Sequence, residues 1–327
     1  MEVIGHRHVR HFLEEVIKRE TVSHAYVFSG PRHVGKTTVA ANFLGSLVTT
    51  DVMQKTDDPW QLLLRYPDFF LVEREEDAKT GKQKKNISVE QIRQLRERLS
   101  LGSLLASWKI GVIMDAETLS LEAANALLKT IEEPAGKTIL LLQTTSLGAL
   151  PATILSRCQL IRFGLVTEQV ILNGLLARGV ETPLAEECAL RAAGRPGVAL
   201  ALAADHARLV EEQEQAGLFV SMIGSPVWQR IAFAEKVAPK KKTVDAAEEA
   251  LQTLSVWQQV LRDALMLSAG EPGLVHHMSV RDHLASWVSK KEKKDIVRGL
   301  LATQEARLAL GENVGPRTAL EHVLLSL

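Results

Sequence analysis

The stretch Gly30-Pro31-Arg32-His33-Val34-Gly35-Lys36-Thr37 decides the fold of this chain. It matches the pattern G-x-x-x-x-G-K-[ST], whose backbone N–H groups surround phosphates while the lysine reaches their outer oxygens and the hydroxyl holds Mg²⁺. Apolar residues at Ala25–Ser29 predict a strand before the loop, and residues 38–48 predict the helix after it. This order indicates a phosphate-binding α/β domain. The phosphate-binding residues that it predicts are Gly30, Gly35, Lys36, Thr37 and Thr38, the last at a helix N-terminus, where the helix dipole favours an anion.

The residues around the loop alternate between strand and helix patterns. Short apolar runs predict further strands at 69–72, 109–114 and 138–142, and a last segment of the sheet domain at 154–163. Apolar residues at helical spacing predict helices at 8–18, 88–99 and 121–132. Strands that alternate with helices favour a mainly parallel sheet covered by helices on both faces. After residue 164 every pattern is helical.

Composition limits the classes of function. The chain has 327 residues, which favours two or three domains, and its 39 Lys and Arg balance its 39 Asp and Glu. Without net charge, contact with DNA requires a local basic patch, and the lysines within 79–85 and 240–242 are more typical of solvated loops. Two cysteines, Cys158 and Cys188, are too few for a zinc site. No apolar stretch approaches the ~18 residues of a membrane span and no secretory signal begins the chain, so we expect a cytoplasmic protein.

The acidic segment after the strand at 109–114 departs from that of a working ATPase. Such enzymes end this strand with an Asp that orders the water shell of Mg²⁺ and a Glu that polarises the attacking water. Counted back from Asn125, the two positions are Met114 and Asp115; in the competing alignment they are Asp115 and Ala116. A thioether is a poor partner for Mg²⁺ and alanine has no base, so both alignments lack one carboxylate. Asp115 is therefore predicted to be a degenerate remnant of the motif, and hydrolysis by this chain alone to be slow or absent.

Two further positions carry candidate chemistry. Thr145 follows the strand at 138–142, where these enzymes place a polar sensor of the γ-phosphate, although a hydrogen-bonded turn at the strand end explains it equally well. Arg157 stands in the triplet Ser156-Arg157-Cys158. An arginine that reaches a neighbour's nucleotide is worth about 10³–10⁵ in rate, whereas a lone surface arginine usually forms a salt bridge.

Several segments resemble bacterial clamp-loader subunits, which belong to the AAA+ ATPase superfamily. The most specific are Asn-Ala-Leu-Leu-Lys-x-x-Glu-Glu-Pro at 125–134 and Ser-Arg-Cys at 156–158. The other matching segments are Gly5-His6, 24–28, 30–37, 66–69, 87–93, Trp257, 261–263 and 313–325, so the resemblance covers most of the chain. Within the family, the chain is similar to delta prime subunits of DNA polymerase III, which typically lose catalytic acidic residues and retain the Ser-Arg-Cys arginine.

The resemblance also sets expectations for organisation and partners. Unlike the motor subunits of that complex, this chain has Gly197 rather than Arg195 at the position of the lid arginine, and no zinc-binding cysteines between Leu44 and Tyr66. The resemblance implies an ATPase-type domain at 1–163, a helical lid at 164–207 and a helical collar at 208–327. The collar would assemble with tau/gamma-type and delta-type subunits into a hetero-pentamer that loads the sliding clamp onto primed DNA in the bacterial cytoplasm.

Within that assembly, Arg157 would complete the ATP site of a neighbour in trans as an arginine finger. The cofactors implied are ATP or ADP, with Mg²⁺ held through Thr37 when nucleotide is bound, and no zinc. Two alternatives stay open. The chain is a hydrolysing motor subunit of the tau/gamma type if Asp115 serves as its base, and an interaction scaffold if the loop is a relic and Arg157 is structural. Steady turnover by the purified protein would separate the motor from the delta prime type.

Overall fold

The computed structural model of the chain describes residues 3–48, 58–76, 81, 83–103, 108–238, 244–312 and 314–327. Lys79, Lys82, the lysines at 240–242 and Asn313 lie outside these ranges. The chain forms two compact units, Met1–Leu200 and Ala201–Leu327. The first contains a parallel sheet with helices, and the described part of the second is helical, which confirms the predicted fold class. The three-domain division at 163 and 207 stays a prediction.

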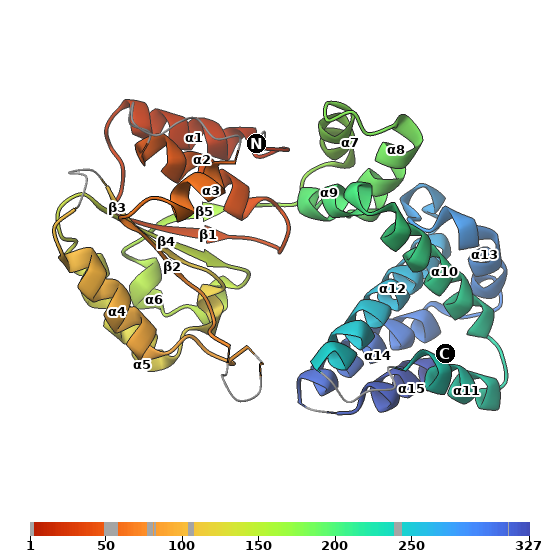
Figure 1. The fold of residues 1–327 in the computed structure, drawn as a ribbon. Coiled ribbons are helices and arrows are strands. Elements are labelled where there is room, and N and C mark those ends of the chain that lie inside the picture. Colours follow the sequence, from red (N-terminus) through yellow and green to blue (C-terminus); the bar gives the residue numbers. More distant parts are fainter. Residues whose placement is uncertain are drawn as a thin grey trace. The chain divides into compact units, whose positions relative to one another are not determined.

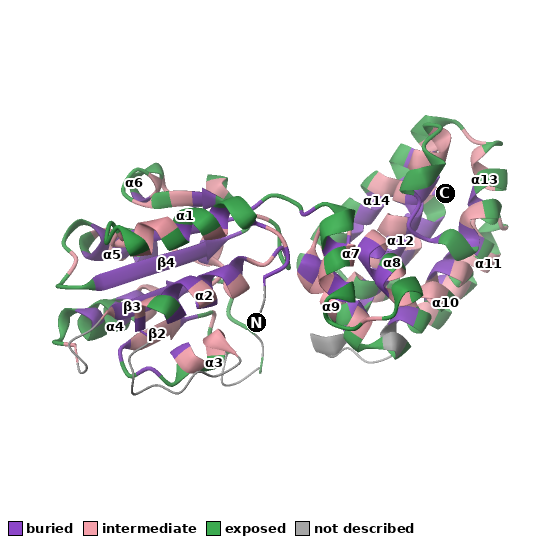
Figure 2. Ribbon diagram, turned by 90° about the horizontal axis from the view of Figure 1, so that it is seen from above, coloured by how far each residue is buried: buried purple, intermediate pink, exposed green. Residues whose placement is uncertain are grey.

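Five parallel strands form the sheet of the first unit. They are β1 (Ala25–Ser29), β2 (Phe69–Val72), β3 (Lys109–Ile113), β4 (Thr138–Thr144) and β5 (Gln159–Arg162), in the spatial order β2-β3-β4-β1-β5. The three central strands are buried along their whole length, as the colour of β4 in Figure 2 shows. This burial explains their nearly continuous apolar sequences, because both faces of a parallel sheet are covered. All five carboxyl ends lie at the same edge.

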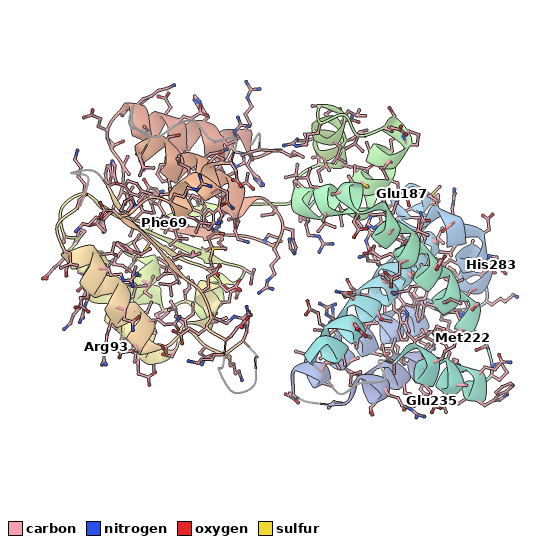
Figure 3. All side chains as sticks on the ribbon, viewed as in Figure 1. Phe69, Arg93, Glu187, Met222, Glu235 and His283 are labelled. Carbon is pink, nitrogen blue, oxygen red and sulfur yellow. The ribbon has the colours of Figure 1, made fainter. Side chains whose placement is uncertain are left out.

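Helices cover both faces of the sheet (Figure 1). Alternate side chains of a strand point to opposite faces. Tyr26 and Phe28 of β1 therefore share a core with α1 (Arg7–Lys18), α2 (Lys36–Val48) and α3 (Pro59–Leu64). Ala25 and Val27 share the opposite core with α4 (Val89–Ser100), α5 (Leu121–Glu132) and α6 (Ala152–Leu155). Phe69, labelled in Figure 3, lies on the edge strand β2. Its ring meets that of Trp60 of α3 edge-on, with ring centroids 5.7 Å apart.

Local signals account for the helix starts. Before α4, the Ser88 side chain accepts from the backbone N–H of Gln91, and the Gln91 side chain accepts from the backbone N–H of Ser88 at 3.1 Å. These two reciprocal hydrogen bonds form a capping box. Helix α3 is absent from the sequence prediction because its six residues are too few to show a helical period. It begins at Pro59, and Asp58 caps it by accepting from the N–H of Trp60 at 3.0 Å.

The remainder of the described chain is helical, as predicted. Helices α7 (Glu168–Leu176) and α8 (Thr182–Arg191) lie in the first unit, and α9 (Pro196–Ala204) begins there. The second unit contains α10 (His206–Met222), α11 (Val227–Val237), α12 (Val244–Ser268), α13 (Arg281–Val288), α14 (Lys293–Gly311) and α15 (Pro316–Ser326). Its core includes Trp257, which stacks on Phe219 with ring centroids 4.7 Å apart. No helix in the described ranges combines the length and apolarity needed to cross a bilayer.

Candidate nucleotide pocket and surface arginine

The candidate site lies at the carboxyl edge of the sheet, where β3, β4 and β1 end side by side. A pocket of about 390 Å³ is lined there by the phosphate loop, by residues that follow β3 and β4, and by the start of α9. Ligands of open parallel sheets bind at this edge. Of the residues predicted from the sequence, those that line the pocket are Gly35, Lys36, Thr37, Thr38, Asp115 and Thr145. The sheet order thus brings together segments that are far apart in the sequence.

The loop leaves β1 in close contact with the chain beyond β5. A Cβ added to Gly30 would lie 2.4 Å from the carbonyl oxygen of Phe163, so only glycine fits there. Gly35 has a φ of 109°, which also favours glycine. Helix α2 then begins at Lys36, whose Nζ donates to the carbonyl oxygens of Gly30 at 2.6 Å and Pro31 at 2.8 Å. The lysine therefore curls back over its own loop.

The hydroxyl predicted to hold Mg²⁺ is engaged by another side chain. Thr37 Oγ1 donates to Oε1 of Gln143 at 2.9 Å. Gln143 is buried in β4, lines the pocket, and has an amide nitrogen without a hydrogen-bond partner among the described residues. Met114 presents a thioether to the pocket. In the described ranges, no three His, Cys, Asp or Glu side chains are grouped so as to hold a metal ion. The Thr37 hydroxyl keeps its lone pairs for a metal while it donates, but with Met114 in place of a carboxylate this set of groups fits a magnesium ion poorly.

Asp115 lies just beyond β3 and is held by two arginines. Its backbone is left-handed, with φ 46° and ψ 48°. Its Oδ2 is 3.3 Å from Nη2 of Arg32 in the phosphate loop and 3.6 Å from Nη2 of Arg74 beyond β2. Because the carboxylate is partly exposed, each pair is worth about 1 kcal/mol or less. The contacts nevertheless occupy one of the two oxygens of the carboxylate that the motor alternative requires as a base.

Glu117 is a pocket-side carboxylate that the sequence analysis missed. Its oxygens accept from the backbone N–H of Thr145 at 3.2 Å and from the Thr145 hydroxyl at 2.6 Å. Burial by itself would raise the pKa of Glu117, but hydrogen bonds from Thr145 and Thr144 hold it below its ordinary value. The predicted γ-phosphate sensor is therefore engaged by Glu117. The available signal was a second acid, two residues after Asp115 in the degenerate motif.

Arg157 lies on the surface between α6 and β5. Its Nε is 2.9 Å from Oε1 of Glu132 at the end of α5, and the side chain of Arg157 is 42% exposed. Its Nη1 also donates to the carbonyl oxygen of Thr153 at 3.1 Å and to Oγ of Ser156 at 3.2 Å. Arg157 is not among the described residues that line the pocket. Its guanidinium is thus displayed at the surface, apart from the nucleotide pocket of its own chain.

The start of α9 closes one side of the pocket. The backbone N–H of Gly197 donates to the carbonyl oxygen of His33 at 2.8 Å, and a Cβ on Gly197 would lie 2.9 Å from that oxygen. A lid arginine at this position would therefore collide with the loop. Arg195 turns to its own chain instead, since its Nε donates to the carbonyl oxygen of Ala192 at 3.1 Å. Neither residue presents a guanidinium to the pocket.

The chain is similar to replication proteins along its length. A family model described as "DNA polymerase III, delta subunit" matches residues 5–167. The delta′ subunit of DNA polymerase III from Bacillus subtilis (strain 168) is 25% identical over 329 residues, which cover 98% of this chain and 95% of that protein. This chain belongs to the family of DNA polymerase III clamp-loader subunits.

Other relatives of this chain match about half of its length. The delta′ subunit of Pseudomonas aeruginosa is 34% identical over 42% of each chain, and the tau subunit of Bacillus subtilis is 32% identical over 53% of this chain and 30% of that protein. The chain spans less than half the length of the tau and gamma subunits that it matches. Among solved structures, a gamma subunit-related protein of Thermotoga maritima aligns with a TM-score of 0.46 and 18% identity over 96% of this chain and 97% of that one.

Proposed function

We propose that this clamp-loader subunit is of the delta prime type. It holds a nucleotide that it hydrolyses slowly or not at all, and it supplies Arg157 to the nucleotide of an adjacent ATPase subunit. The observation that carries the proposal is the exposed guanidinium of Arg157, displayed apart from the chain's own pocket. An arginine in that place serves a site on another molecule, where developing phosphoryl charge makes a cation valuable.

The chain's own pocket supports the first half of the proposal. The phosphate loop is complete and Lys36 is in place, so ATP or ADP has a cradle. Hydrolysis also requires a carboxylate that is free to polarise water. Asp115 is paired with two arginines through one oxygen, and both oxygens of Glu117 accept from Thr145, so each carboxylate must give up a contact before it can do so. The predicted catalytic motif is therefore degenerate in arrangement as well as in sequence.

The relatives support the kind of partner. Matches to tau, gamma and delta′ subunits of DNA polymerase III favour a hetero-oligomer of such subunits, with Arg157 at the face toward a tau/gamma-type neighbour. By the resemblance, that assembly is a hetero-pentamer that loads the sliding clamp onto primed DNA. The described ion pair to Glu132 holds the guanidinium at the surface until the neighbour's phosphate competes for it.

The test is the DNA-stimulated ATPase of the assembled complex with Arg157→Ala. We expect normal assembly by size-exclusion chromatography and a fall in turnover of about 10³-fold or more at the site that the arginine serves. Arg19→Ala is the matched control, because Arg19 is also an exposed arginine paired with a glutamate, at 3.3 Å. Full turnover in the assembled Arg157→Ala complex would refute the assignment.

The similarity to tau subunits keeps the motor type as the second candidate. It predicts steady phosphate release by the purified chain with ATP, abolished by Lys36→Ala, because the lysine neutralises the outer phosphates. The delta prime type predicts binding of a fluorescent ATP analogue without release. Steady release that is insensitive to Lys36→Ala would point to a contaminating ATPase and contradict the motor type.

A further inference from the structure

We propose that this pocket neutralises nucleotide phosphates with the side chains of Arg32 and Lys36 in place of a magnesium ion, so that nucleotide binds without Mg²⁺. The inference rests on the proposed nucleotide binding and goes beyond it by replacing the metal with a residue of the loop. It is independent of the trans role of Arg157.

The first step of the argument is the poor fit of the metal. Mg²⁺ requires near-octahedral oxygen ligands, usually a loop hydroxyl, waters held by carboxylates and phosphate oxygens. The Thr37 hydroxyl already donates to the buried Gln143. Met114 supplies sulfur in place of a carboxylate, and Asp115 is shared between two guanidinium groups. The Thr37 hydroxyl keeps its lone pairs for a metal, but the carboxylates that would hold the waters of the ion are missing or paired with arginine.

The second step is the charge that remains. Within the described lining of the pocket, the permanent cations are Arg32 and Lys36. Burial is the main cause that lowers the pKa of Lys36; the charges of Glu117 and Asp115 raise it and that of Arg32 lowers it, so Arg32 and Lys36 are close enough for their charges to interact. Because the loop lysine accompanies Mg²⁺ in phosphate loops that use the ion, the added positive charge here is that of Arg32, which supplies part of the charge that the ion would supply.

The third step is the freedom of Arg32 to act. A guanidinium has five N–H donors in a planar fork suited to phosphate. The described contact of Arg32 with Asp115 uses one terminal nitrogen, and the Arg32 side chain is 61% exposed. The remaining donors are available while that contact persists. Gly197 leaves no room for a lid arginine, so Arg32 is the guanidinium that the described lining offers to the outer phosphates.

The experiment titrates the full chain with methylanthraniloyl-ATP, once with Mg²⁺ and once with EDTA. We expect the same Kd in both buffers. Arg32→Ala should raise the Kd about 10- to 100-fold in both, the usual effect of losing a hydrogen bond to a charged group. Arg74→Ala is the matched control, because Arg74 also contacts the Asp115 carboxylate but is absent from the described lining of the pocket. The Arg74→Ala variant should bind methylanthraniloyl-ATP with the Kd of the wild type.

The outcomes are distinct. Loss of wild-type binding in EDTA would overturn the inference, as would an Arg32→Ala variant that binds like the wild type. Thermal unfolding of each variant shows that it is folded, which we expect because Arg32 is largely exposed. Absence of binding in both buffers would refute nucleotide binding and this inference together. The ATPase test with Arg157→Ala would then still decide the trans role by itself.

Discussion

Replacing Gly197 with alanine tests whether the start of α9 is part of the nucleotide pocket. The N–H of Gly197 donates to the carbonyl oxygen of His33 at 2.8 Å, and an added Cβ would lie 2.9 Å from that oxygen and 3.2 Å from the His33 Cβ. The first distance is too short for a backbone contact, so α9 must move away from the loop. Pro196 and Leu200, which line the pocket, move with it.

Two opposing terms set the effect on stability. Loss of the hydrogen bond to His33 costs about 1 kcal/mol. Alanine in place of glycine in a helix returns up to about 1 kcal/mol. The free energy of unfolding should therefore change little. Nucleotide affinity has no such compensation, since withdrawal of Leu200 removes roughly half the burial of one aliphatic side chain. Half of that burial is worth about 0.75–1.5 kcal/mol, or about 4- to 12-fold in Kd.

The assay pairs methylanthraniloyl-ADP titration with thermal unfolding followed by circular dichroism. Gly217→Ala is the control, because it also places alanine in a helix but its Cβ meets nothing within 4 Å. We expect Gly217→Ala to keep the wild-type Kd. An unchanged Kd in the Gly197→Ala protein would refute the inference that the start of α9 is part of the nucleotide pocket. A fall of several kcal/mol in the free energy of unfolding would show that alanine in the helix does not offset the lost hydrogen bond to His33.

Two further predictions concern buried groups. Asp263→Asn should lower the free energy of unfolding by about 1–3 kcal/mol. The reason is that the fully buried carboxylate accepts from the N–H and Nδ1 of His277 at 2.9 and 2.8 Å. An unchanged midpoint of unfolding in urea would contradict this. Burial by itself would raise the pKa of Asp263, but hydrogen bonds from His277 and His276 hold it below its ordinary 3.8. The stability that the carboxylate contributes is therefore present above pH 3.8 and is lost as the pH falls through the lowered pKa. Unfolding by acid measures this loss. Burial raises the pKa of the Cys158 thiol to about 11, so about 0.1% of it is thiolate at pH 8. Alkylation of Cys158 by iodoacetamide should therefore be far slower than that of free cysteine. Rapid labelling of Cys158 in the native protein, located by mass spectrometry, would contradict this.

Elements with strong local signals could be predicted from the sequence. The strand at Ala25–Ser29, the loop after it and the capping box at Ser88 are each encoded within a few neighbouring residues. The fold class followed because apolar strands alternate with helices of regular period. Helix α3 was missed because one and a half turns carry no readable period.

The sequence by itself determined the phosphate loop, the lack of one carboxylate in the acidic segment at 114–116 and the family resemblance, because each depends on residue type and spacing along the chain. Only the tertiary structure decided what the polar groups do. The pairing of Asp115 with Arg32 spans 83 residues, and that of Glu117 with Thr145 spans 28. These partners meet because β3, β4 and β1 lie side by side, and strand order depends on how the whole sheet packs. No local pattern encodes that packing.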